Sequence, residues 1–465
     1  MDMSRDVMNA NNNIADPIRF ITSEKFLPEK KYCLGVIENY LGVPISITID
    51  NAYSNRYAFA VDGKQSIACR DAFFAIHQED VGYIQESNIP TSIDHLDAKE
   101  FGVVRLPIIF GDEQFSVSDD QISIGLDIIG SMFFMLSRWE EIANTSRDHY
   151  DRFSAKDSVA FKFNFLLHPV VDQYCELLRV LINQFDCQFD RPSEPKARIR
   201  YTCDVDHIVD PTTNNIYGLT KSLLRTAIGK YPSRPIVSTL KRYLRGENAY
   251  DCFDYIFKSL HHKNIEGAFY FITGGNSQFD GTYDFMEQDV SILLQKISQN
   301  GFEVGLHPSF MTYKDSEQTK LEFDKLRRHA EQVSIHQDLW GGRQHYLRWD
   351  PEITKRNWEK AGLSYDSTLG YADHVGFRTG TCRDHKLFDP IERREVNLIE
   401  RPLMLMDVTL VDKHYMDYGY SQKAYETIQN LKEQCALYGG SFNFLWHNSH
   451  LSTDEDRALF EYCID

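Results

Sequence analysis

The chain has 465 residues, which is more than one ordinary hydrophobic core accommodates, so two or three domains are expected. Hydrophobic residues make up 42% of the sequence and aromatic residues 13%, which excludes a largely disordered chain. The formal net charge of −18 argues against nonspecific binding to nucleic acid or to an anionic membrane.

The sequence shows no export or membrane signal. Residues 1–17 are polar and rich in asparagine, and they lack the apolar core of a secretion signal. The most apolar stretch, 122–136, is interrupted by Asp127 and is too short to span a bilayer. None of the cysteines has the two-residue spacing of a zinc knuckle or redox motif, which favours thiols in a reducing compartment. We therefore expect a cytoplasmic protein without a transmembrane segment; a peripheral membrane contact stays open.

Residues 1–190 are expected to form a smaller, mixed α+β domain, and their polar residues show no catalytic spacing. The expected elements are a strand-rich region at 32–41 and 45–49 around a Gly-Val-Pro turn, a hairpin of 115–117 with 121–124, and helices at 127–142 and 168–182. A segment with two prolines, 188–196, is expected to link this domain to the next.

Residues 191–465 alternate between strand and helix patterns. Strands are expected at 198–203, 267–272, 303–306, 338–342, 364–367, 403–405 and 441–446. Helices are expected between most of them, at 251–263, 285–300, 318–335, 351–361 and 422–438. This α/β alternation predicts a parallel sheet with crossover helices, and about seven such units predict a closed or nearly closed barrel. In barrels of this kind the chemistry lies at the carboxyl ends of the strands.

Polar residues follow several of the expected strands. Asp204 and Asp206 end the first strand, and the alternation of an extended chain places both carboxylates on one face. Two neighbouring carboxylates repel unless a cation lies between them, which suits a metal ligand beside a general base. His307 ends the third strand, and Arg343 and His345 share a face after the fourth. An arginine in this place would orient Asp204.

The later strands add further candidates. Asp366 follows the fifth strand, Tyr371 and Arg378 lie in a glycine-containing loop that could approach a sugar, and Trp446 and His447 end the last strand. Taken singly, each polar residue also fits a structural role, such as a cap, a buried hydrogen-bond donor, a surface ion pair or a connecting loop. Their order on successive strand ends favours one shared site.

This ordered set resembles the polysaccharide deacetylase family (carbohydrate esterase family four) over about residues 198–449. Thr202-Cys203-Asp204-Val205-Asp206 is similar to the first family motif, Thr-Phe-Asp-Asp-Gly. Leu306-His307-Pro308-Ser309 resembles the start of the second motif, and residues 342–346 correspond in order to the third, Phe-Arg-Pro-Pro-x-Gly. Leu445-Trp446-His447 resembles the final motif. Together with Tyr-Asp-Ser-Thr-Leu-Gly-Tyr, the set also resembles a bacterial subgroup that carries an extra N-terminal domain.

The resemblance implies a distorted (β/α)7-type barrel and the removal of an acetyl group from an N-acetylated or O-acetylated sugar of a bacterial glycan or its precursor. It implies a divalent metal, with Asp204 as catalytic base, His447 as catalytic acid and Arg343 in the place of the family arginine. Asp366, Tyr371, Arg378 and Trp446 are the residues expected to bind the substrate.

Two departures from the family pattern affect the metal site. Val205 separates the two aspartates, so the roles of base and ligand could be exchanged between them. Met311 stands where the second metal-binding histidine of the family motif is expected, and it cannot replace it. We therefore expect Asp206, His307 and His345 to hold Zn²⁺, with Fe²⁺, Co²⁺ or Ni²⁺ as alternatives.

Two other functions stay open. A catalytically degenerate barrel could bind a glycan without hydrolysing it, or a related metal-dependent amidase could act on a non-sugar amide. An insertion at 207–248 could hold an anionic part of a carbohydrate or glycoconjugate substrate, or could be a solvated helical excursion. Its basic residues are Lys221, Arg225, Lys230, Arg234, Lys241, Arg242 and Arg245.

Overall fold

The computed structural model divides the chain into two compact units. It describes residues 18–465 with gaps at 62–64, 78–80, 100–101, 186, 191–196, 211–218, 221–239, 241–242 and 282. The first unit contains the described parts of Met1–Tyr83, Ser92–Phe133 and Gln173–Pro192, and the second contains those of Ile84–Thr91, Phe134–Asp172 and Ser193–Asp465. Residues 134–172 thus pack within the second unit, although the sequence placed them in an N-terminal domain. A domain boundary near residue 190 stays a prediction.

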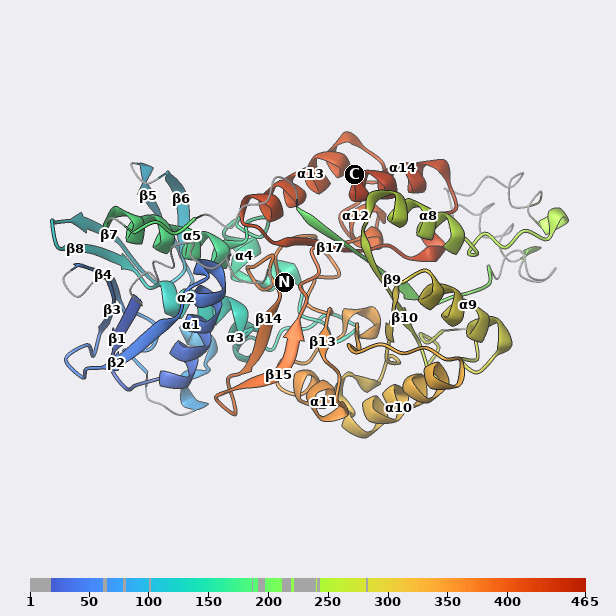
Figure 1. The fold of residues 1–465 in the computed structure, drawn as a ribbon, viewed down its shortest axis with the longest axis horizontal. Coiled ribbons are helices and arrows are strands. Elements are labelled where there is room, and N and C mark those ends of the chain that lie inside the picture. The colour runs from blue at the N-terminus through green and yellow to red at the C-terminus, as the bar shows by residue number, and fades with distance from the viewer. Residues whose placement is uncertain are drawn as a thin grey trace, which may run out of the picture. The chain divides into compact units, whose positions relative to one another are not determined.

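The first unit is built on a six-stranded mixed sheet in the order β2-β1-β3-β4-β8-β7 (Figure 1). Its strands are β1 (Ile18–Thr22), β2 (Ile45–Ile49), β3 (Arg56–Val61), β4 (Gln65–Arg70), β7 (Gly111–Val117) and β8 (Gln121–Leu126). The parallel pair of β1 and β2 is connected by α1 (Leu27–Leu41). A separate two-stranded sheet pairs β5 (Asp94–Ala98) with β6 (Val103–Ile108).

The expected hairpin is confirmed, because β7 and β8 pair antiparallel around the turn at Asp119-Asp120. The expected strand at 32–41 is wrong, because these residues lie in α1. Leu34, Ile37 and Leu41 are buried at helical spacing, and Gly42 ends the helix with a φ of 70°. The helix expected at 127–142 is interrupted.

That interruption lies at Arg138, where the backbone turns left-handed with a φ of 54°. The segment forms α2 (Ile128–Leu136) and α3 (Trp139–Ala143), and the guanidinium of Arg138 donates to the carbonyl of Met135 at 2.9 Å. The side chain thereby satisfies a carbonyl that the broken helix leaves without its usual partner. The next helices are α4 (Val159–Lys162) and α5 (Val170–Ile182).

The second unit contains a nine-stranded sheet in the order β14-β15-β13-β12-β11-β10-β9-β17-β16. The strands are β9 (Arg198–Val205), β10 (Glu266–Phe271), β11 (Glu303–Leu306), β12 (Gly341–Gly342), β13 (Tyr365–Asp366), β14 (His385–Asp389), β15 (Arg394–Glu400), β16 (Leu405–Met406) and β17 (Ser441–Leu445). All neighbours are parallel except β14 and β15, which form an antiparallel hairpin that the sequence reading missed. The expected α/β alternation is confirmed, but no pairing between β14 and β16 closes the sheet among the described residues, so the closed barrel is not confirmed.

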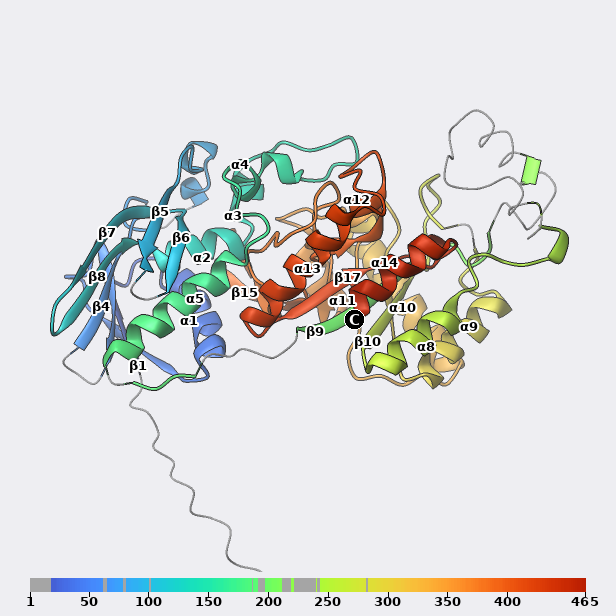
Figure 2. The ribbon, with the colours of Figure 1, turned by 90° about the horizontal axis from the view of Figure 1, so that it is seen from above.

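Helices follow most strands of this sheet, as crossover connections require. They are α8 (Phe253–Lys263), α9 (Gln288–Gln299), α10 (Ser316–Gln332), α11 (Thr354–Ala361), α12 (Asp407–Val411), α13 (Gln422–Leu437) and α14 (Asp454–Ile464). Figures 1 and 2 show α8, α9, α13 and α14 outside the central strands of the unit. In the described residues, no helix combines the length and apolar character needed to cross a membrane.

The alternation along β9 separates the core from the site. Tyr201, Cys203 and Val205 point into the main hydrophobic core of the second unit. Thr202 and Asp204 take the opposite face and are also buried, although they are polar. The strand therefore presents its carboxylate on the side of the sheet that the helices do not cover.

Candidate metal centre

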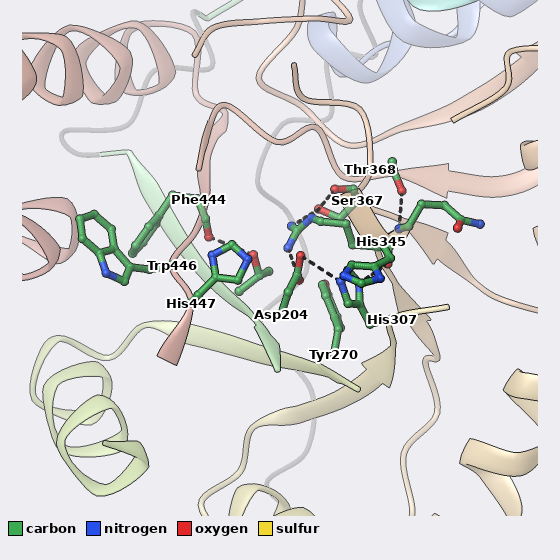
Figure 3. A network of polar contacts seen from close by, with 12 residues as sticks. Asp204, Tyr270, His307, His345, Ser367, Thr368, Phe444, Trp446 and His447 are labelled. Carbon is green, nitrogen blue, oxygen red and sulfur yellow. Dashed lines mark hydrogen bonds and ion pairs between the residues drawn. The ribbon is translucent and has the colours of Figure 1, made fainter. Parts of the chain in front are cut away.

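Five of the predicted site residues follow the carboxyl ends of neighbouring parallel strands. Asp206 follows β9, His307 follows β11, Arg343 and His345 follow β12, and His447 follows β17 by two residues. Parallel neighbours end at the same edge of a sheet, so residues far apart in the sequence meet there. Figure 3 shows Asp204 with His447 on one side and with His307 and His345 on the other.

Asp206, His307 and His345 form a compact triad. The Oδ1 atom of Asp206 lies 3.4 Å from Nε2 of His307 and 3.6 Å from Nε2 of His345. The imidazole rings meet edge to face with centroids 4.7 Å apart. One ligand atom from each residue lies within 4.8 Å of the others, which is close enough for all three to contact one cation.

The chemistry of this triad fits a divalent metal. Asp206 Oδ1 is buried and accepts no hydrogen bond from a described residue, although two imidazole nitrogens face it. Burial by itself would raise the pKa of Asp206, but the contacts with His307, His345 and His447 hold it well below its usual range. An ionised carboxylate between two imidazoles is the kind of ligand set that Zn²⁺ and similar ions select.

Arg343 fixes the second carboxylate, Asp204. Its Nη1 donates to Asp204 Oδ1 at 2.9 Å, and both side chains are almost completely buried. The guanidinium is itself held by Ser367, whose carbonyl accepts from Nε at 2.8 Å and whose hydroxyl lies 3.0 Å from Nη2. The other oxygen of Asp204 lies 3.8 Å from His307 Nε2. Arg343 thus orients one carboxylate oxygen and leaves the other beside the triad.

His447 lies on the side of Asp204 opposite to His307 and His345 (Figure 3). Its Nε2 lies 3.8 Å from Asp206 Oδ2, and its Nδ1 lies 2.8 Å from Asp407 Oδ1. The backbone N–H of His447 also donates to Asp407 Oδ2 at 2.8 Å. Burial alone would lower the pKa of His447, but the Asp407 carboxylate, with Asp206 and Asp204, raises it to about 9. The imidazole is therefore protonated near neutral pH and can donate a proton.

Asp407 was not among the residues predicted from the sequence. It directly follows β16, which pairs with β17, so the strand-end rule would have identified it. Asp280 was also missed, and it lies in the loop after β10. Its Oδ1 lies 3.7 Å from His345 Nδ1 and accepts a hydrogen bond from the N–H of Phe310 at 2.7 Å. Nothing in the residues around Asp280 distinguishes it from other loop aspartates.

Solvent reaches this group of residues on one side. The side chains of Asp206 and His447 are 26% and 12% exposed, whereas those of Asp204, His307 and His345 are at most 4% exposed. A substrate would therefore approach along Asp206 and His447. The imidazole of His447 and the carboxylate of Asp206 are thus the two groups of the site that solvent reaches.

The four residues expected to bind substrate are buried. Asp366 Oδ1 accepts hydrogen bonds from Thr368, and the indole N–H of Trp446 donates to the carbonyl of His450 at 2.8 Å. Arg378 forms a bidentate pair with Glu141, at 2.8 and 2.6 Å. These contacts are those of structural residues, so a role in substrate binding stays a prediction.

Tyr371 lies in the same buried ion cluster as Arg378. Its hydroxyl accepts a hydrogen bond from Arg138 Nη2 at 3.2 Å, and Arg138 also pairs with Glu141 at 2.9 Å. The loop that looked suited to a sugar is thus held by residues of the segment 134–172 within the second unit. Tyr371 and Arg378 are buried in this cluster, whereas Asp373 and His374 of the same loop are about one-fifth exposed.

Two further sequence features are placed only in part. Met311 is 63% exposed, and its sulfur lies 3.8 Å from Arg348 Nη1, so it takes no part in the triad. Of the basic residues in the insertion, only Arg245 falls among the described residues, and it pairs with Glu247 at 3.5 Å. The others lie outside the described residues.

Comparison with known proteins gives one family match and a low structural similarity. Residues 18–186 match a family described as a family of unknown function (DUF7033). The comparison with curated proteins finds no match.

Among solved structures, the chain is similar to a protein described as a polysaccharide deacetylase from Mycobacterium smegmatis, with 16% identity, a TM-score of 0.37, and 58% of this chain and 85% of that chain covered. It is also similar to Puue allantoinase, with 12% identity, a TM-score of 0.35, and coverage of 60% and 88%. A protein described as a polysaccharide deacetylase from Pseudomonas aeruginosa PAO1 has 14% identity, a TM-score of 0.33, and coverage of 59% and 87%. At this level of similarity, the geometry of the site has to support a function by itself.

Proposed function

We propose that the second unit is a metal-dependent hydrolase that removes an acetyl group from an N-acetylated or O-acetylated sugar. The observation that carries the proposal is the triad of Asp206, His307 and His345, flanked by an arginine-held carboxylate and by a protonated histidine. Amide or ester hydrolysis needs a base for the attacking water and an acid for the leaving group, and both lie beside the triad.

Asp206, His307 and His345 are the residues that would hold the metal. Two imidazoles and one carboxylate leave coordination positions open, which suits Zn²⁺ and also Fe²⁺, Co²⁺ or Ni²⁺. A divalent cation supplies Lewis acidity, which polarises an acyl oxygen and lowers the pKa of a water molecule.

Asp204 is the proposed base. One of its oxygens accepts the hydrogen bond from Arg343, so the other, which faces the triad, is available to take a proton from the attacking water. The alternative, in which Asp204 is the ligand and Asp206 the base, is less favourable. Asp204 is tied to the guanidinium of Arg343, and Asp206 Oδ1 is the atom that both imidazoles face.

His447 is the proposed acid. Its Nδ1 is held by Asp407, which leaves Nε2 directed toward the triad. With a pKa raised to about 9 by that carboxylate, the imidazolium can give its Nε2 proton to the departing amine or alkoxide. Asp407 positions the ring through both the Nδ1 contact and the backbone N–H of His447.

The function can be tested with a substrate panel and a metal measurement on the same purified protein. We expect close to one divalent ion per chain and acetate release from acetylated sugars, with both lost after chelation and restored by Zn²⁺. Retained metal with hydrolysis of simple amides alone would indicate an amidase of another class. Glycan binding without stoichiometric metal or acetate release would indicate a binding protein.

Asp280 gives a prediction about metal affinity. Replacing Asp280 with asparagine is expected to weaken metal binding by about 10- to 100-fold, because a carboxylate near the second nitrogen of a ligating histidine orients the ring and raises its basicity. Competition with a chelator of known affinity measures this change. Asp284→Asn is the matched control, since Asp284 is an exposed carboxylate of the same loop.

The result also decides what Asp280 does. The carboxylate of Asp280 accepts hydrogen bonds from the backbone N–H groups of Phe310 and Ser277, at 2.7 and 2.8 Å. Equal metal affinity in the wild type and in Asp280→Asn would mean that Asp280 only holds the loop through these bonds.

A further inference from the structure

The loop between α3 and α4 belongs to the second unit, although it precedes the sheet of that unit by about fifty residues in the chain. Its residues 148–155, here called the strap, hydrogen-bond to the loops that follow β11, β12 and β13 of that unit, and the first of these bonds runs from Lys314 Nζ to the carboxylate of Asp151 at 3.0 Å. The carbonyl of Tyr150 accepts from Arg348 Nε at 2.8 Å, and Arg152 Nη1 donates to the carbonyl of Tyr346 at 3.2 Å. Ser154 and Ala155 both donate to the carboxylate of Asp373, at 2.5 and 3.0 Å.

The strap contacts the residue that directly follows the metal ligand His345. Tyr346 has φ and ψ of 62° and 14°, and Leu347 has a φ of 56°. Two consecutive side-chain-bearing residues rarely adopt this left-handed conformation, which persists only where surrounding contacts enforce it. The hydrogen bond from Arg152 to the Tyr346 carbonyl is one such contact.

Three half-buried aromatic rings meet at this point. The ring centroid of Tyr346 lies 5.1 Å from that of Tyr150 and 5.6 Å from that of Phe279, and Tyr150 and Phe279 are 5.8 Å apart. The buried ring of Phe310 packs behind them, 4.5 Å from Phe279 and 5.3 Å from Tyr346. Tyr346 is also 4.8 Å from the ring of His345. The cluster is therefore continuous with the metal triad.

A pyranose ring is the occupant that such a surface fits. Its faces carry C–H groups that pack on aromatic rings, and its edge carries hydroxyl groups that need polar partners. Tyrosine supplies both, with an apolar ring and a polar tip. The guanidinium of Arg152, which pairs with Asp148 at 2.8 Å, lies over the Tyr150 ring at 4.9 Å from its centroid and adds a polar group to the border of the cluster.

We propose that Tyr150, Phe279 and Tyr346 form a sugar subsite beside the metal triad, and that Tyr150, supplied by the strap, determines the preference for a sugar over a small acyl compound. The inference rests on the proposed function, and it names the part of the chain that would recognise the sugar. The strap is held through the backbone carbonyl of Tyr150 and through other side chains, so removal of the Tyr150 ring leaves those hydrogen bonds in place.

The test begins with binding, which does not depend on hydrolysis. Calorimetry with N-acetylglucosamine and N-acetylgalactosamine trisaccharides is expected to show binding to the full-length protein. The affinity should fall about 3- to 10-fold in Tyr150→Ala, as expected for the loss of one aromatic contact. Tyr150→Phe, which keeps the ring and loses the hydroxyl, should bind more tightly than Tyr150→Ala, and Lys156→Ala, which changes an exposed side chain just beyond the strap, should stay within about twofold of the wild type.

Kinetics separates recognition from chemistry. In Tyr150→Ala we expect a raised KM for the acetylated trisaccharide and unchanged acetate release from methyl acetate, whose methoxy group is too small to contact the Tyr150 ring. Absence of trisaccharide binding in the wild type, or equal binding in Tyr150→Ala, would overturn the subsite. Equal losses on both substrates with a lower thermal stability would also overturn it, because they indicate a structural role. Sugar binding without acetate release would support the subsite and contradict the proposed hydrolase instead.

Discussion

His307→Ala is expected to lose both the metal and the activity. The variant removes one of three proposed ligands and leaves Asp206 facing a single imidazole, so a divalent ion would have too few protein ligands to stay bound through purification. Because the proposed reaction needs the bound metal as a Lewis acid, acetate release should fall below detection when the metal is lost. Metal content by mass spectrometry and acetate release by a coupled assay measure the two losses on one sample.

A matched control separates ligand loss from the loss of any buried histidine. His329 lies on the helix α10 and not at a strand end, is 5% exposed, and contacts Ser291 at 3.0 Å. His329→Ala should keep its metal and its turnover even if its thermal stability falls. If His307→Ala retained stoichiometric metal, the triad would not be the metal site, and the hydrolase proposal would lose its main support.

His447→Ala is expected to keep the metal and to lose turnover by about 10²- to 10⁴-fold, the usual contribution of a positioned general acid. The imidazole is not part of the triad, and its Nε2 is 3.8 Å from Asp206, so its removal leaves the three ligands in place. Single-turnover acetate release and metal content measure the two quantities separately.

Asp204→Asn is the companion variant to His447→Ala. The amide oxygen can still accept the hydrogen bond from Arg343, but an amide cannot take a proton from water, so a loss of similar size is expected. Metal should remain bound if Asp206 is the ligand. Loss of metal in Asp204→Asn with metal retained in Asp206→Asn would show that the two aspartates have exchanged roles. Full activity in His447→Ala would show that His447 is not the general acid.

Much of the site was predictable because strand ends are visible in a sequence. The alternation in Arg198–Val205 shows that Asp204 lies on the face opposite Tyr201 and Cys203, and the structure has this arrangement. An apolar run that stops at a histidine, as at His307, gives the same kind of signal. The expectation that His345 is the third ligand came from the family resemblance, in which Met311 stands where a second histidine is expected, and the structure brings His345 to Asp206.

The contacts that the sequence did not reveal involve partners far away in the chain. Arg378 looked suited to a sugar, but its partner is Glu141, which lies 237 positions earlier. Asp280 lies beside His345 only because the loop after β10 folds against it. The helix α1 was read as strand because its apolar residues fit both patterns over a short stretch, and packing decided between them.

The amino-acid sequence by itself determined the parallel α/β order of the second unit and the identity of the polar side chains at its strand ends. These properties follow from local periodicity, which each segment carries independently of the others. Only the tertiary structure decided which side chains share a contact, that Asp407 holds His447, and that the strap lies against Tyr346. Such contacts depend on distances between segments separated by many residues, and no local pattern contains those distances.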